Sequence, residues 1–284
     1  MDLLNYRGFN CHLACVVNMA AALGVNYPDA FVSLWSEREF TDYPPNNIYI
    51  SKRVFANLDA LGTQTEIFNC ASPAETAVSL SLIPDGELFF VGLESFYIPW
   101  HPLYQHFYNR HYFFARMEQA EYLTCFDPIF NQKDVLIKFA DIAAFAYDLG
   151  YLRLAAAKPL PALKQVAREI LVNHPPMQKY LQSEILKCEH RPLGEFAPLI
   201  KLIDALIGNR YMFQLFLHQS PAPFTGSRQF FDGNFLGRWD AVKSGLYKAY
   251  ILKDKEKTVN EVSDLFVGLI REEIALAKEI IGMD

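Results

Sequence analysis

The spacing of apolar residues predicts a helix near the start of the chain. Five apolar side chains recur at helical spacing within residues 11–23, namely Leu13, Val16, Val17, Ala20 and Leu23. Asn10 before this segment and Gly24 after it are residue types that cap the start and the end of a helix. The pattern therefore places Cys11 in the first turn.

Helices and strands are predicted in succession up to residue 154. Further helices are expected after Pro28, over 51–61 and over 73–82, where Ser72 and Glu75 form a capping box. Runs rich in aromatic and β-branched residues predict strands over 65–69, 87–94, 111–117, 121–127, 134–139 and 151–154.

From Pro159 onward the apolar spacing is that of helices. The predicted helices are 160–173, 176–187, 195–207, 209–218, 237–252 and 258–281, with a long loop over 220–236. The sequence thus predicts an α+β fold: residues 1–156 form a domain with a leading helix and an antiparallel sheet, and residues 157–284 form an all-helical domain.

Composition and charge narrow the class of protein. Hydrophobic residues make up 51% and charged residues 20% of the 284, as expected for a folded globular chain. The net charge is −6, which argues against a general nucleic-acid binder. Residues 13–25, the best apolar stretch, are too few for a membrane span. Five scattered cysteines favour a reducing compartment, and we expect a cytoplasmic protein.

Three residues predict a nucleophilic site. Unpaired N–H groups at the start of a helix stabilise a thiolate, so Cys11 is the candidate nucleophile, whereas Cys15, one turn further in, is expected to be buried. A hairpin turning at Gln119 would set His111 beside Asp127, as base and orienting group. A zinc site at Cys11 is not expected, because no second close pair of ligands exists.

Short motifs around these residues resemble two families. Cys11 to Cys15 with Gly24, the His111-Tyr112-Phe113-Phe114 strand and Phe126-Asp127-Pro128 resemble bacteriocin-processing cysteine peptidases, which have glycine where this chain has His12. The segment Val91 to His101, with Tyr104, His106 and His111, is similar to the butirosin-biosynthesis protein H family, which usually has aspartate at the position of Glu94.

The second resemblance, over residues 5–150, implies a papain-like domain and a reaction. That reaction is acyl transfer from an acyl carrier protein or peptidyl carrier domain thioester to a small amine, without metal or cofactor. Papain-like sites hold the oxyanion with the nucleophile's own N–H and a side-chain amide a few residues earlier, for which Asn5 is the candidate. Five residues are assigned to substrate binding: Glu94, Tyr97, Trp100, His101 and Tyr104. The alternative for the aromatic ones is a loop that packs on the sheet.

Charge suggests where partners would bind. A basic run is a candidate docking surface for an acidic carrier protein, with a solvated helix face as the alternative; it comprises Lys243, Lys248, Lys253, Lys255 and Lys257. Two other functions stay open: a thioesterase or cysteine peptidase using the same three residues, and a non-catalytic binding protein. Neither nucleic acid nor a membrane is an expected partner, and the choice between monomer and homodimer is left open.

Overall fold

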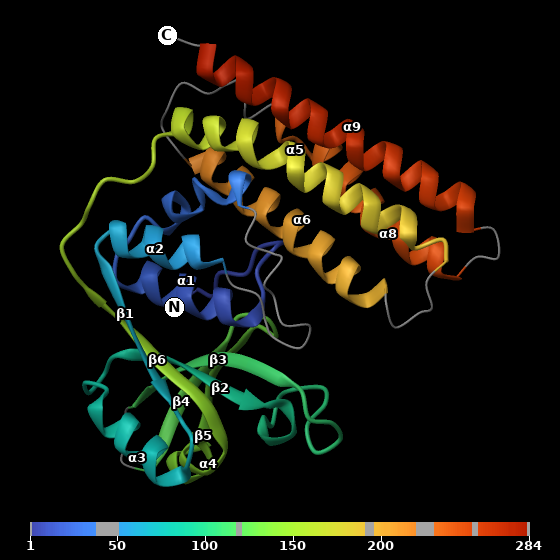
Figure 1. The fold of residues 1–284 in the computed structure, drawn as a ribbon. Coiled ribbons are helices and arrows are strands. Elements are labelled where there is room, and N and C mark those ends of the chain that lie inside the picture. Colours follow the sequence, from blue (N-terminus) through green and yellow to red (C-terminus); the bar gives the residue numbers. More distant parts are fainter. Residues whose placement is uncertain are drawn as a thin grey trace. The chain divides into compact units, whose positions relative to one another are not determined.

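The chain folds into two compact units (Figure 1). The first is Met1–Tyr27 with Val54–Pro159, and the second is Pro28–Arg53 with Leu160–Asp284. The computed structural model describes residues 2–37, 51–117, 121–190, 196–219, 230–251 and 255–282. The division after Pro159 lies three residues beyond the predicted one, whereas residues 28–53, which the sequence placed in the first domain, belong to the second unit.

A six-stranded antiparallel sheet organises the first unit. Its spatial order is β1-β6-β2-β3-β4-β5, and each neighbouring pair is antiparallel. The strands are β1 (Thr63–Asn69), β2 (Leu88–Glu94), β3 (Arg110–Met117), β4 (Tyr122–Asp127), β5 (Gln132–Lys138) and β6 (Ala146–Leu154). The predicted α+β class is confirmed.

Helices cover both faces of this sheet, as Figure 1 shows. The helices of this unit are α1 (Cys11–Ala22), α2 (Lys52–Ala60), α3 (Pro73–Leu82) and α4 (Phe139–Phe145), with a short 3-10 turn η3 (Ser95–Tyr97). Two further 3-10 turns, η1 (Tyr27–Phe31) and η2 (Leu34–Ser36), lie in the segment that belongs to the second unit, apart from Tyr27. On β2, Phe90 contacts His12 of α1, whereas Phe89 joins the core that includes Leu80 of α3 and Ile142 of α4. Strands buried on both faces read as continuous apolar runs, which is why the central strands were recognisable in the sequence.

Helix α1 begins and ends as the capping residues predict. The Asn10 side chain accepts a 2.9 Å hydrogen bond from the Leu13 N–H, and Gly24 adopts a positive φ of 77°. Inside the helix, the buried Asn18 side chain exchanges two 2.8 Å hydrogen bonds with the backbone of Leu4. This polar residue within an apolar helix therefore fixes the segment that leads into α1.

The prediction was incomplete at β6. The sequence indicated a strand only over 151–154, but β6 begins at Ala146, directly after α4, and lies between β1 and β2. Asp148 and Gly150 are residue types that strands disfavour, so the segment did not resemble a strand. Gly150 is needed because a Cβ there would lie 2.4 Å from the ring of Phe90.

Long helices make up most of the second unit. They are α5 (Leu163–Lys187), α6 (Phe196–Gln219), α8 (Gly233–Ile251) and α9 (Lys255–Gly282). Where breaks were predicted near Pro175 and Gly208, α5 and α6 continue, because packing outweighs the local cost of these residues. The predicted loop 220–236 ends earlier than expected, since α8 starts at Gly233; residues 220–229 lie outside the described ranges. None of the helices in the described ranges is long and apolar enough to cross a membrane.

Specific contacts explain why residues 28–53 join the helical unit. Trp35 stacks on Phe213 of α6 with ring centroids 5.2 Å apart. Arg53 lies 2.7 Å from the carboxylate of Glu169 on α5, which also accepts a hydrogen bond from Ser36. These partners are more than a hundred residues away in sequence, so local pattern could not show them.

A buried carboxylate connects the four long helices. Glu273 of α9 accepts hydrogen bonds from His174 of α5 at 2.7 Å, from Arg210 of α6 at 2.8 Å and from Trp239 of α8 at 3.2 Å. The Arg210 guanidinium also lies 4.3 Å from the centre of the Trp239 ring. Since Glu273 and Arg210 are both fully buried, each charge depends on the other.

Candidate functional site

His111 and Asp127 form a buried hydrogen-bonded pair in the first unit. Nε2 of His111, near the start of β3, lies 2.7 Å from Oδ2 of Asp127, the last residue of β4. His111 is 5% exposed and Asp127 is fully buried. A carboxylate can only accept, so Nε2 carries the proton and Nδ1 is the nitrogen left for another partner.

The strand register that brings them together differs from the predicted one. A turn at Gln119, which lies outside the described residues, would set Phe114 opposite Thr124, whereas the structure pairs Phe114 with Phe126. A shift of two residues keeps every side chain on its predicted face, and diagonal neighbours remain within reach of long side chains. The pairing of His111 with Asp127 therefore survives the error.

Cys11 also interacts with the imidazole of His111. Burial alone would lower the pKa of His111, but hydrogen bonds with Asp127 and Cys11, together with their charges, raise it to about 9. Cys11 is half-buried at the N-terminus of α1, where backbone N–H groups lack helical partners. One turn further, Cys15 is fully buried, and burial raises its pKa well above that of an ordinary thiol. The two cysteines thus have different environments.

Four donors hold the Asp127 carboxylate in place. Oδ1 accepts hydrogen bonds from the backbone N–H groups of Ile129 at 2.9 Å and Phe130 at 3.3 Å. Oδ2 accepts from the indole of Trp100 at 2.7 Å in addition to His111. Trp100 therefore orients the aspartate, whereas the sequence analysis assigned it to substrate binding.

A second histidine contacts His111. The ring of His101 lies edge-on to that of His111 at 5.0 Å, and both rings contact Phe130. The Leu103 N–H donates to Nδ1 of His101 at 3.0 Å, which leaves the proton of the neutral ring on Nε2. Burial and then the charge of His111 lower the pKa of His101. Rings therefore enclose His111 on this side.

The other residues assigned to substrate binding have contacts of their own. Tyr97 stacks on Phe145 at the end of α4, with centroids 3.9 Å apart. The hydroxyl of Tyr104 accepts a hydrogen bond from its neighbour Gln105 at 3.1 Å. Glu94, half-buried at the end of β2, pairs in register with Arg110. The stacking of Tyr97 agrees with the alternative of an aromatic loop that packs on the fold, and its assignment to substrate binding stays a prediction.

Asn5 lies in the segment that Asn18 anchors, one residue after Leu4. Its side chain is exposed, and no hydrogen bond joins it to another residue in the described part of the chain. The structure therefore neither pairs Asn5 with Cys11 nor fixes its amide elsewhere. Asn18 is a positioning residue that sequence reasoning missed, although a lone polar residue on an apolar helix face was a usable signal.

The basic run of the second unit is partly neutralised. Lys243 forms an ion pair with Asp204, and Lys257 lies 4.0 Å from Glu261. Lys255 lies over the ring of Phe196, and Lys253 is outside the described residues. Its use as a docking surface stays a prediction.

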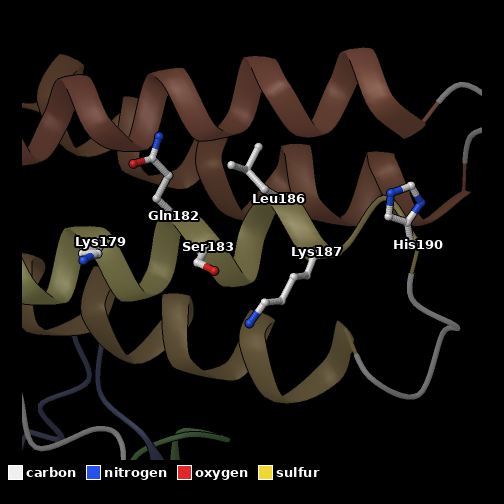
Figure 2. Close-up of a pocket in the computed structure, with 6 residues that line it drawn as sticks. All are labelled: Lys179, Gln182, Ser183, Leu186, Lys187 and His190. Atoms are coloured by element: carbon white, nitrogen blue, oxygen red, sulfur yellow. The ribbon is translucent and has the colours of Figure 1, made fainter.

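A separate surface pocket lies in the second unit, along α5 (Figure 2). Its lining comes from the C-terminal part of this helix and from the turn that follows it: Lys179, Gln182, Ser183, Leu186, Lys187 and His190. Gln182 points toward α9, where its amide lies 3.4 Å from the Ser263 hydroxyl. No group of three His, Cys, Asp or Glu side chains in the described ranges is arranged to hold a metal ion.

In the comparison with known proteins, no protein-family model matches the chain, and no curated protein matches it. The geometry at Cys11, His111 and Asp127 is therefore the basis for the functional argument. It comprises a thiol at a helix N-terminus, an imidazole whose charged form is favoured, and a carboxylate with a full set of donors.

Proposed function

We propose that this protein is a cysteine-dependent acyltransferase with a papain-like site, in which Cys11 carries the acyl group. The observation that carries the proposal is the His111 imidazole, which hydrogen bonds Asp127 through Nε2 at 2.7 Å and interacts with Cys11. A nucleophile, a base and a group that orients the base are the parts that covalent catalysis by cysteine requires.

In the first half-reaction, His111 takes the thiol proton of Cys11, and the resulting thiolate attacks the carbonyl carbon of a thioester. The N–H of Cys11 at the helix N-terminus donates to the oxyanion, with Asn5 as the proposed second donor. His111 then gives its proton to the leaving thiol sulfur, and the C–S bond to the donor breaks. The products are acyl-Cys11 and a free thiol, with His111 neutral.

In the second half-reaction, an amine attacks the acyl-Cys11 carbonyl. A C–N bond forms, the C–S bond to Cys11 breaks, and the proton released from nitrogen passes to His111. Asp127 keeps Nδ1 directed at the reacting groups throughout. The resemblance of residues 5–150 supplies the proposed donor, a carrier-protein thioester, and the proposed acceptor, a small amine.

The burial of the site favours transfer over hydrolysis. Asp127 is fully buried, and the rings of His101 and Phe130 cover His111. Such a surrounding limits the access of water to the base, which is what an acyl-enzyme needs in order to survive until an amine arrives. The same acyl-enzyme would serve a thioesterase or peptidase, so the product distinguishes the functions.

The test is acylation by a short-chain acyl thioester of N-acetylcysteamine, a small stand-in for the carrier thioester, followed by intact mass and peptide mapping. We expect an adduct on Cys11 in the natural protein and none at this position in Cys11→Ala. Cys70→Ala is the matched control, because Cys70 is also half-buried and should be dispensable. An adduct of equal yield in Cys11→Ala would refute the proposal. Amide formed with added amine indicates transfer, and free acid alone indicates hydrolysis.

A further inference from the structure

A β-bulge places a second polar cluster beside the nucleophile. Gly92 of β2 pairs with Asp148 of β6, but Leu93 pairs with Ala146, so Tyr147 is an extra residue in β6. Bulges of this kind redirect side chains and are frequent next to active sites. The Tyr147 ring lies across Gly92, where a Cβ would come within 2.5 Å of it, so glycine is required there.

The bulge brings two phenols and a carboxylate together. The Tyr112 hydroxyl donates to Oδ2 of Asp148 at 2.9 Å, and the rings of Tyr112 and Tyr147 meet edge-on at 5.6 Å. The Tyr147 hydroxyl donates to the backbone oxygen of His111 at 3.2 Å. Burial first, and also the charge of Cys11, raise the pKa of both tyrosines. The cluster is therefore within electrostatic reach of the sulfur.

The charge of this cluster favours a cation. Asp148 and Glu94 are acidic, and Arg110 lies 5.1 Å from the centre of the Tyr147 ring. Burial raises the pKa of Asp148, whereas hydrogen bonds from Tyr112 and the Leu149 backbone and the charge of Arg110 oppose this rise. Two negative charges and one positive charge leave a net charge of −1 on these three residues. Tyr147 and Asp148 are both half-buried, so a small molecule can approach them from solvent.

An imidazole with an unpartnered nitrogen packs against the cluster. His12 stacks flat on Tyr112, with centroids 4.2 Å apart and planes 9° from parallel. Burial lowers the pKa of His12 to about 3, so the ring is neutral. Its Nε2 is buried and has no hydrogen-bond partner within the described part of the chain. Buried polar atoms of this kind are rare in folded proteins without a bound water or ligand.

We propose that Tyr112, Tyr147 and Asp148 form the acceptor subsite, and that this subsite binds a primary amine in its ammonium form next to acyl-Cys11. The inference rests on the proposed acyl transfer. An ammonium group offers three N–H donors, which match one carboxylate and two phenol oxygens. Before attack the ammonium releases one proton to water; during attack the amine nitrogen gives a second proton to His111.

The experiment uses the full chain, with 1,4-diaminobutane as the amine probe. Cys11 is acylated with the short-chain thioester, excess thioester is removed, and the loss of the adduct is followed by mass spectrometry against amine concentration. For Asp148→Asn and Tyr112→Phe we expect the amine concentration for half-maximal deacylation to rise about tenfold or more, as loss of a charge-assisted hydrogen bond implies. Tyr151→Phe is the matched control, since Tyr151 also lies half-buried in β6 but packs against Phe68.

A binding measurement separates failure of this inference from failure of the proposed function. Diaminobutane is titrated by NMR into Cys11→Ala, alone and combined with Asp148→Asn, where no chemistry occurs. Binding that weakens about tenfold with Asp148→Asn supports the subsite even if acylation of Cys11 fails. Absence of binding to Cys11→Ala, or equal amine dependence in all acylated variants, overturns the subsite and leaves the acyl-enzyme proposal standing.

Discussion

Replacement of Asp127 by asparagine tests whether the donors around this carboxylate define the site. Each oxygen of Asp127 accepts two N–H donors: Oδ1 from Ile129 and Phe130, and Oδ2 from Trp100 and His111. An amide has one oxygen and one NH₂ group. Whichever way the asparagine is turned, its NH₂ group therefore faces two donors that have lost their acceptor.

The structure gives the size of the effect. Each buried donor without an acceptor costs about 1–3 kcal/mol, and one or two donors lack an acceptor, depending on whether His111 changes its tautomer. Asp127→Asn should therefore lower the free energy of unfolding by about 1–6 kcal/mol. If the NH₂ group faces His111, the imidazole must accept through Nε2, and its proton moves to Nδ1. The pKa of His111 then falls from about 9 toward its ordinary value of about 6.5, and alkylation of Cys11 at neutral pH should slow by at least about tenfold.

Two assays check this prediction: the rate of iodoacetamide alkylation at Cys11, read by peptide mass spectrometry, and urea unfolding. Asp134→Asn is the matched control, because Asp134 is exposed on β5. If Asp127→Asn reacts and unfolds like the control, the four-donor description of this site is wrong.

Two further predictions concern the imidazole and the buried ion pair. In an NMR titration, the ring signals of His111 should change near pH 9 in the natural protein, with the imidazolium present below that pH. Cys11→Ala should lower this midpoint, because His111 loses a hydrogen bond and a nearby charge. An unchanged midpoint in the variant would contradict the contact between His111 and Cys11. Glu273→Gln should lower the free energy of unfolding of the helical unit by about 3–5 kcal/mol, because Arg210 is left buried without its counter-ion. Glu272→Gln, which breaks a partly exposed ion pair, should cost less than about 1 kcal/mol in the same chemical denaturation, and equal losses in the two variants would count against the buried network.

The sequence was most informative where local chemistry determines structure. Asn10 and Gly24 bracket α1 because a side-chain oxygen and a residue tolerant of positive φ are local requirements. The apolar runs of β2 and β3 were recognisable because both faces of these strands are buried. At Pro175, by contrast, a local rule predicted a break that the packing of α5 against α9 overrides.

The sequence predicted the main residues of the site, but it did not predict the residues that hold them in position. His111 and Asp127 stood out because hairpin geometry links them, and an error of two residues in register preserved their shared face. Trp100 was recognised as a member of the site, but its hydrogen bond to Asp127 spans 27 residues of chain and has no local signature. Tyr147 owes its position to a bulge, and a bulge leaves no pattern in the alternation of a strand.

The path of the chain links the stability of the site to that of the helical unit. Residues 1–27 and 54–159 form the first unit, but the 26 residues between them fold with the second. If the helical unit unfolds, these 26 residues become a flexible loop between the two parts of the first unit. Holding the ends of a loop of this length together costs about 3 kcal/mol of chain entropy. A domain of this size is commonly stable by only about 5–15 kcal/mol, so the cost is a substantial fraction of the total. Loss of the Glu273 network should therefore also weaken the unit that holds Cys11, although none of the residues described at the site belongs to the helical unit.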